Sequence, residues 1–177
     1  MPVTGCLALA ATKNTPIFSR DEIQPWPTED EQMYPRFLVV SQFVLSAVLV
    51  LSVDWWPVPK WPLLLASPGI LLIGWSVGAM GLSKTRIHPT PSESTRLVTP
   101  GPYRFVRHPM YLGLLWLTGA LLTAPPSLWR VGVWFVLLAV LVAKSRIEDR
   151  ALKLLFSEYA HYASNVGGLL PKPFGKR

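Results

Sequence analysis

Cysteine is nearly absent from this chain of 177 residues, which contains Cys6 and no other. A single cysteine excludes an internal disulfide and the paired-cysteine spacing of zinc sites, so we expect no bound metal. No Gly-x-Gly-x-x-Gly fingerprint follows a plausible strand, and the sequence therefore does not indicate a soluble Rossmann domain. Charged side chains are also sparse, at 15% of residues against 50% hydrophobic ones. This composition is typical of a small, single-domain membrane protein.

Long apolar runs contain most of the hydrophobic residues. Their lengths, roughly 15 to 20 residues, are close to what a helix needs to cross the hydrocarbon of a bilayer. Trp55 and Trp56 follow the first run, in a position typical of a membrane interface. We expect an all-α, polytopic membrane protein with about four transmembrane helices, at residues 37–53, 61–80, 110–124 and 128–143.

Turns and small residues predict how these helices pack. The turn at 125–127, Pro-Pro-Ser, is tight, so the third and fourth spans should form an antiparallel hairpin. Such a hairpin brings the polar segments on either side of it to the same face of the membrane. In the second span, small residues predict a surface for close packing against another helix, namely Gly74, Gly78 and Gly81.

Basic residues are concentrated in two segments. Residues 82–109 hold five lysines and arginines against one acid, and residues 144–177 hold seven against three. No continuous basic stripe is present, so nucleic acid is not an expected partner. Under the positive-inside rule both segments lie in the cytoplasm, and four spans then place both termini there. We expect a bacterial inner membrane or another membrane that faces the cytoplasm.

The two ends of the chain differ in character. Residues 1–35 are polar, with five acids against two bases, and predict an irregular cytoplasmic extension without a cleaved signal. After residue 144, charged and apolar side chains interleave at helical spacing, which predicts a cytoplasmic amphipathic helix at 146–164. The chain therefore divides into this N-terminal extension and a membrane domain at 36–177.

The most distinctive stretch is a basic loop at 101–113, with the sequence Gly-Pro-Tyr-Arg-Phe-Val-Arg-His-Pro-Met-Tyr-Leu-Gly. It leads directly into the third apolar span, so its arginines and histidine should lie where water meets hydrocarbon. Charged groups at that boundary are either interface anchors or parts of a site. Pro102 and Pro109 stiffen the loop and allow a helix to begin at or just after Pro109.

A second polar block follows the predicted hairpin and contains Arg146, Glu148 and Asp149. In this order, the two blocks resemble the signature of the isoprenylcysteine carboxyl methyltransferase and phospholipid methyltransferase superfamily, over about residues 74–171. The resemblance implies that residues 36–177 form a membrane methyltransferase that uses S-adenosylmethionine. Its acceptor would be a lipophilic small molecule or prenylated substrate reached from the bilayer. Isoprenylcysteine-like carboxylate O-methylation is the first expectation, and a thiol or amine lipid is possible.

The resemblance also implies which residues form the site. From the chemical groups of the methyl donor alone, Arg107 and His108 would engage its carboxylate, and Glu148 its ribose or ammonium. Methyl transfer from a sulfonium needs oriented reactants and exclusion of water, but no metal. The implied catalytic residues are Arg146, which would hold a substrate carboxylate, and Glu148, which would orient that arginine. The implied cofactor-binding residues are Tyr103, Arg107, His108, Tyr111, Leu112, Gly113, Glu148, Asp149 and Tyr159.

Two other classes of protein are alternatives. A membrane NADPH-dependent reductase of the steroid-reductase type would use Arg104 and Arg107 to bind the phosphates of its cofactor. A non-catalytic membrane scaffold would use residues 146–149 as an interfacial salt-bridge cluster. Binding of S-adenosylhomocysteine or of NADPH would distinguish the methyltransferase from the reductase, and a scaffold would bind neither.

Overall fold

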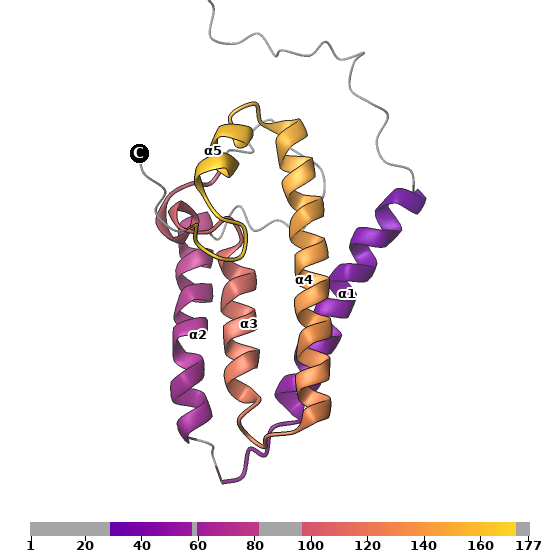
Figure 1. Ribbon diagram of the computed structural model, residues 1–177, viewed down its shortest axis with the longest axis vertical. Coiled ribbons are helices and arrows are strands. Elements are labelled where there is room, and N and C mark those ends of the chain that lie inside the picture. The colour runs from indigo at the N-terminus through magenta and orange to yellow at the C-terminus, as the bar shows by residue number, and fades with distance from the viewer. Residues whose placement is uncertain (1–28, 58–59, 82–96, 173–177) are drawn as a thin grey trace, which may run out of the picture.

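The named secondary-structure elements in the described part of the chain are all helices. A computed structural model describes residues 29–57, 60–81 and 97–172, and these ranges contain no strand (Figure 1). The prediction of an all-α fold is confirmed for them. The elements are α1 (Glu29–Leu51), α2 (Lys60–Met80), the 3₁₀ helix η1 (Gly101–Arg104), α3 (Pro109–Leu121), α4 (Leu128–Leu155) and α5 (Tyr159–Asn165).

Two of the helices, α2 and α4, are long and apolar enough to cross a membrane. The apolar part of α1, Arg36–Leu51, and α3 are shorter apolar helices. Large apolar side chains on these elements are exposed, among them Phe43, Leu71 and Trp116. Water-soluble surfaces seldom expose apolar side chains over such an extent, so these helices have the features of a membrane protein.

The helices form two pairs that share one apolar core. Helix α2 packs along α3, and α1 packs along α4 (Figure 1). Buried leucines of α1, α3 and α4 join the pairs, namely Leu49, Leu115, Leu137 and Leu141. Because α3 and α4 run antiparallel, η1, the start of α3, the end of α4 and α5 all gather at one end of the bundle (Figure 1). The prediction that the hairpin brings the two polar blocks together is confirmed.

The tightest helix contact lies between α2 and α3. A Cβ atom at Gly69 would lie 2.6 Å from the carbonyl oxygen of Gly113, and a Cβ at Gly113 would lie 2.7 Å from Cγ1 of Ile73. The prediction that Gly74, Gly78 and Gly81 provide the close-packing surface is therefore wrong. Among the described residues, no other part of the chain comes within 4 Å of a Cβ built at any of these three positions. The buried face of α2 carries Gly69 instead, together with Pro62, Ala66 and Ser76.

Substitution of Gly69 should separate α2 from α3. We expect Gly69→Val to reduce the free energy of unfolding by about 1–3 kcal/mol, because its side chain would overlap the backbone of α3. Gly74→Val is the matched control, since it adds the same side chain to the same helix in open space. Thermal unfolding of the detergent-solubilised variants measures both effects. Equal melting temperatures for the two variants would contradict the proposed contact.

Side-chain hydrogen bonds satisfy backbone carbonyls beside Pro68 and around Arg130. Pro68 has no N–H to donate to the carbonyl of Leu64, and the Ser67 hydroxyl donates to that carbonyl instead, at 2.7 Å. At the opposite end of the bundle from α5, the buried guanidinium of Arg130 donates to backbone carbonyls, including that of Leu121 at 2.8 Å. The other two acceptors are the carbonyls of Leu49, at 3.3 Å, and Pro125, at 2.6 Å. One side chain thus satisfies carbonyls at the ends of α1 and α3.

Several helix ends differ from the predicted positions. The predicted boundary between a span ending at 143 and an amphipathic helix at 146–164 is wrong, because α4 continues to Leu155 and α5 is separate. The residues after 143 are mostly good helix formers, so the change in polarity does not end the helix. Helix α1 begins at Glu29, inside the predicted irregular extension at 1–35. Residues 1–28 of that extension lie outside the described part of the chain.

Candidate functional site

The polar loop ahead of α3 is shaped by glycine and proline. Gly101 has φ +67°, in the left-handed region that glycine adopts most readily, and it begins η1 beside Ala79 of α2. Pro109 occupies the first position of α3, where a missing N–H leaves no helical bond unmade. His108 therefore lies at the N-cap of α3, and it is buried.

The segment after α5 forms backbone hydrogen bonds with the same loop. The backbone N–H of Arg107 donates to the carbonyl of Gly167 at 2.8 Å, and the N–H of His108 donates to that of Gly168 at 3.2 Å. Val106 and Gly167 also form an isolated parallel β-bridge. The backbone that presents Arg107 and His108 is thus fixed by residues distant in the sequence.

Asp149 is the centre of the side-chain cluster. Its carboxylate pairs with Nη2 of Arg107 at 3.0 Å and with Nε2 of His108 at 2.9 Å. It also accepts a hydrogen bond from the hydroxyl of Tyr159. Its side chain is 17% exposed, and that of Arg107 is 16% exposed. One carboxylate therefore joins the loop, α4 and α5, and little of it remains open to a ligand.

Glu148 is more open than its neighbour. Its carboxylate accepts a hydrogen bond from the hydroxyl of Tyr111 at 2.5 Å and lies 3.5 Å from Nδ1 of His108. Its side chain is 39% exposed. The rings of His108 and Tyr111 are stacked, with centroids 5.4 Å apart and planes inclined by 3°. Both ring nitrogens of His108 thus face carboxylates, and the free lone pairs of the cluster belong mainly to Glu148.

Three tyrosines outside the long helices surround the cluster. The hydroxyl of Tyr162 donates to the carbonyl of Tyr103 at 2.5 Å, and the rings of Tyr159 and Tyr162 meet edge to face. Burial raises the pKa of Tyr103, and the charge of Glu148 raises it further. Burial also raises the pKa of Tyr159, helped by its hydrogen bond to Asp149, and raises the pKa of Tyr162 to about 12. All three hydroxyls therefore remain protonated donors at neutral pH.

Two buried donors at the cluster have no partner among the described residues. They are the hydroxyl of Tyr103 and Nε of Arg107. Buried polar groups without partners are rare in proteins and call for an explanation. Apart from His108, the charged side chains of the cluster are Arg107 and the two carboxylates of Glu148 and Asp149. The cluster thus combines unused donors with two carboxylates.

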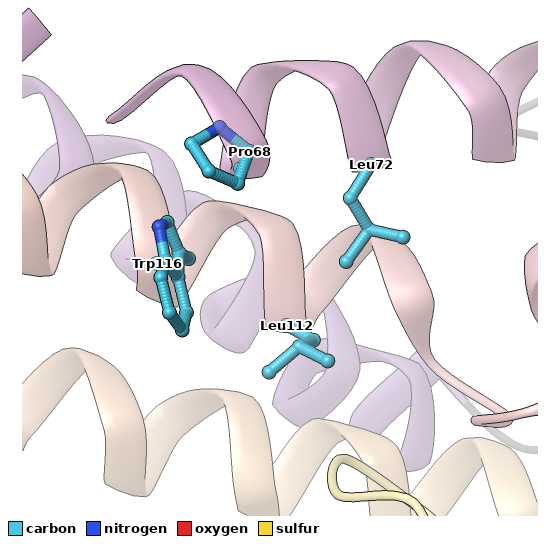
Figure 2. A pocket seen from close by; sticks show the side chains of 5 residues that line it. Pro68, Leu72, Leu112 and Trp116 are labelled. Carbon is cyan, nitrogen blue, oxygen red and sulfur yellow. The ribbon is translucent and has the colours of Figure 1, made fainter. Parts of the chain in front are cut away.

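The structure brings together seven of the ten residues predicted for the site and leaves three outside the cluster. Arg146 is exposed on α4 and forms no ion pair with the described residues. Gly113 contacts α2. Leu112 lines a shallow apolar hollow of about 120 Å³ between α2 and α3, with Pro68, Leu72 and Trp116 (Figure 2). The seven are Tyr103, Arg107, His108, Tyr111, Glu148, Asp149 and Tyr159.

Other contacts of the site have weaker signals in the sequence. Tyr162 could be suspected from the sequence because it is a tyrosine, and four of the five tyrosines of the chain lie at this site. The backbone support from Gly167 and Gly168 could be suspected only from the glycine pair itself. Within the described ranges, no group of three His, Cys, Asp or Glu side chains is arranged to hold a metal ion.

Comparison with known proteins gives a family for this arrangement. A family model described as phospholipid methyltransferase matches residues 61–159, more than half of the chain. The cobalt-zinc-cadmium resistance protein CzcN of Cupriavidus metallidurans is 32% identical over 138 residues, which cover 76% of this chain. The match covers 61% of the length of CzcN, and no solved structure matches the chain. The chain therefore belongs to the phospholipid methyltransferase family, within the isoprenylcysteine and phospholipid methyltransferase superfamily.

Proposed function

We propose that this protein is an integral membrane methyltransferase that uses S-adenosylmethionine and acts on a lipophilic acceptor. The observation that best supports this proposal is that Arg107, His108 and Tyr111 meet Glu148 and Asp149 at one end of the bundle. These residues come from segments about 40 positions apart, and all lie within or beside the part that matches the family. In this proposal, residues 36–177 form the methyltransferase domain.

The chemistry of the cluster suits the proposed cofactor. S-adenosylmethionine carries a sulfonium, an ammonium and one carboxylate, so its net positive charge suits a cluster that contains two carboxylates. When bound, it supplies a methyl group on positively charged sulfur. The unpartnered Nε of Arg107 and hydroxyl of Tyr103 provide donors for the carboxylate. The open carboxylate of Glu148 provides an acceptor for ribose hydroxyls or the ammonium.

The remaining residues of the cluster hold these groups in place. Asp149 directs Arg107 and His108, and the hydroxyl of Tyr159 directs Asp149. The side chain of Tyr159 lies fully inside the protein, at 1% exposure, so its role here is positioning. Such preorganisation lets a site orient two reactants without rearranging when they bind.

Access from the bilayer follows from the arrangement of the helices. In this proposal α1 and α3 also span the membrane, which gives four spans with the cluster and both termini on the cytoplasmic side. The acceptor would enter between exposed apolar helix faces. A carboxylate of the isoprenylcysteine kind is the preferred acceptor, with a lipid thiol or amine as alternatives. Arg146, exposed two residues before Glu148, remains our candidate for contacting that acceptor.

The reductase alternative receives less support from the geometry. A nicotinamide dinucleotide phosphate carries several negative charges and would need cations that are free to pair with them. Asp149 already balances the charge of Arg107, which leaves Nε as a single hydrogen-bond donor, and Arg104 lies over the ring of Phe105. Two carboxylates beside such a cofactor would repel it. The cluster is therefore better suited to a cationic cofactor.

A transfer assay tests the proposed function. Purified protein is incubated with methyl-labelled S-adenosylmethionine and a membrane lipid extract, and label is then followed into the organic phase. We expect a labelled lipophilic product that is absent when the protein is boiled. An extract that stays unlabelled, while labelled S-adenosylmethionine binds the protein, would contradict methyl transfer to a lipophile.

A further inference from the structure

A lysine on the bilayer side of the cluster plays no part in the function proposed so far. Lys144 lies on α4 one helical turn before Glu148, which places it about 6 Å further along the helix, away from α5. Its ammonium donates to Oε1 of Gln42 on α1 at 2.9 Å. It also lies 4.9 Å from the ring centroid of Tyr111 on α3. Three helices thus meet around this one cation.

The surroundings of Lys144 leave its charge without a direct partner. A lysine commonly pairs with a glutamate four residues away on a helix. Here Glu148 attracts the ammonium only at longer range, because its oxygens are engaged by Tyr111 and His108. No carboxylate among the described residues forms an ion pair with Lys144. A partly buried cation without an ion-pair partner is costly and is usually functional.

The geometry also leaves hydrogen-bonding capacity unused. A lysine ammonium has three N–H donors, and Gln42 accepts one of them. The face of the Tyr111 ring attracts the cation but accepts no conventional hydrogen bond. The Lys144 side chain is half-buried, so a ligand can still reach it. The amide nitrogen of Gln42 offers a further donor beside the ammonium.

We propose that Lys144 and Gln42 form a binding site for an anionic oxygen group, a carboxylate or a phosphate, on the headgroup of the amphiphilic acceptor. This inference rests on the proposed function, because it assigns the acceptor side of the same site. Tyr111 separates the two subsites: its hydroxyl faces Glu148 and its ring faces Lys144. An acceptor anchored by Lys144 would present its headgroup next to the donor site while its tail stays in the bilayer. Lys144 is thus a specificity-determining residue.

Binding of simple amphiphiles to the full-length protein in neutral-detergent micelles tests this site. The probes are radiolabelled dodecanoate, dodecyl phosphate and dodecanol, which share a chain and differ in headgroup. We expect the two anions to bind about tenfold more tightly than the alcohol, as one charge-assisted hydrogen bond predicts. We expect Lys144→Met to remove this preference and Lys144→Arg to retain it. Lys153→Met, which removes an exposed lysine from the same helix, should have no effect.

The proposal is overturned if the wild-type protein binds dodecanol as tightly as the anions, or if Lys144→Met keeps the preference. Inorganic phosphate at the same concentration should not compete, and equal competition would overturn the assignment to an amphiphile. Titration with S-adenosylhomocysteine separates this proposal from the proposed function. The Lys144→Met variant should still bind that ligand normally, which also shows that it is folded. A wild-type protein that prefers anions but does not bind S-adenosylhomocysteine would contradict the proposed function alone.

Discussion

Replacement of Asp149 by asparagine is expected to destabilise the protein more than any other single change in the cluster. The substitution removes the charge that pairs with Arg107 and His108 and weakens the bond from Tyr159. Loss of one partner from a largely buried ion pair leaves the other charge uncompensated, which costs about 3 kcal/mol or more. Because Asp149 joins three segments, we also expect α5 and the loop to lose their fixed positions.

Thermal unfolding and limited proteolysis measure this effect. The melting temperature of Asp149→Asn should fall by several degrees, and cleavage near residues 156–158 should become faster. Glu158→Gln is the control, because it also turns an acid into an amide but at an exposed position. If Asp149→Asn unfolds and is cleaved like Glu158→Gln, Asp149 is not the central link of the cluster.

Replacement of Glu148 by glutamine should weaken cofactor binding and leave the stability of the protein nearly unchanged. Glutamine has nearly the same shape and can still accept from the hydroxyl of Tyr111, and the position is 39% exposed. We therefore expect the free energy of unfolding to change by less than about 1 kcal/mol. The negative charge, however, is lost from the side chain that we assign to the methyl donor. We expect affinity for S-adenosylhomocysteine to fall about 10- to 100-fold, as for loss of a charged hydrogen bond.

Calorimetric titration and melting curves on the same preparation test the Glu148 prediction. The expected result is weak binding by a protein that melts at the wild-type temperature. Methyl transfer should fall at least in proportion. Normal affinity in Glu148→Gln would remove Glu148 from the donor site, and a large fall in melting temperature would show that its role is structural.

The meeting of the two polar blocks was predictable from the sequence because it depends on coarse features. The tight turn at 125–127 makes α3 and α4 antiparallel, so the start of α3, which follows His108, and the later turns of α4, which carry Glu148, lie toward the same end of the bundle. Apart from Tyr159 of α5, the predicted site residues that meet in the cluster lie at 103–111 and in the last turns of α4. Arg146 differs because its direction depends on the rotation of α4, and that is set by packing across the whole bundle.

Finer features depend on contacts that the sequence does not reveal. Residues 156–158 separate α4 from α5, so α5 is oriented independently of α4 and Tyr159 reaches Asp149. The bond between Lys144 and Gln42 is equally hidden, because it joins residues about 100 positions apart. Neither residue belongs to a recognisable motif.

The most direct test of the central claim is calorimetric titration of the purified, folded protein with S-adenosylhomocysteine and, separately, with NADPH. A cluster with two carboxylates and unused donors at Tyr103 and Arg107 should bind S-adenosylhomocysteine at a single site and give no signal with NADPH. Absence of binding by S-adenosylhomocysteine, or saturable binding of NADPH in its place, would contradict the assignment of this cluster to a sulfonium methyl donor.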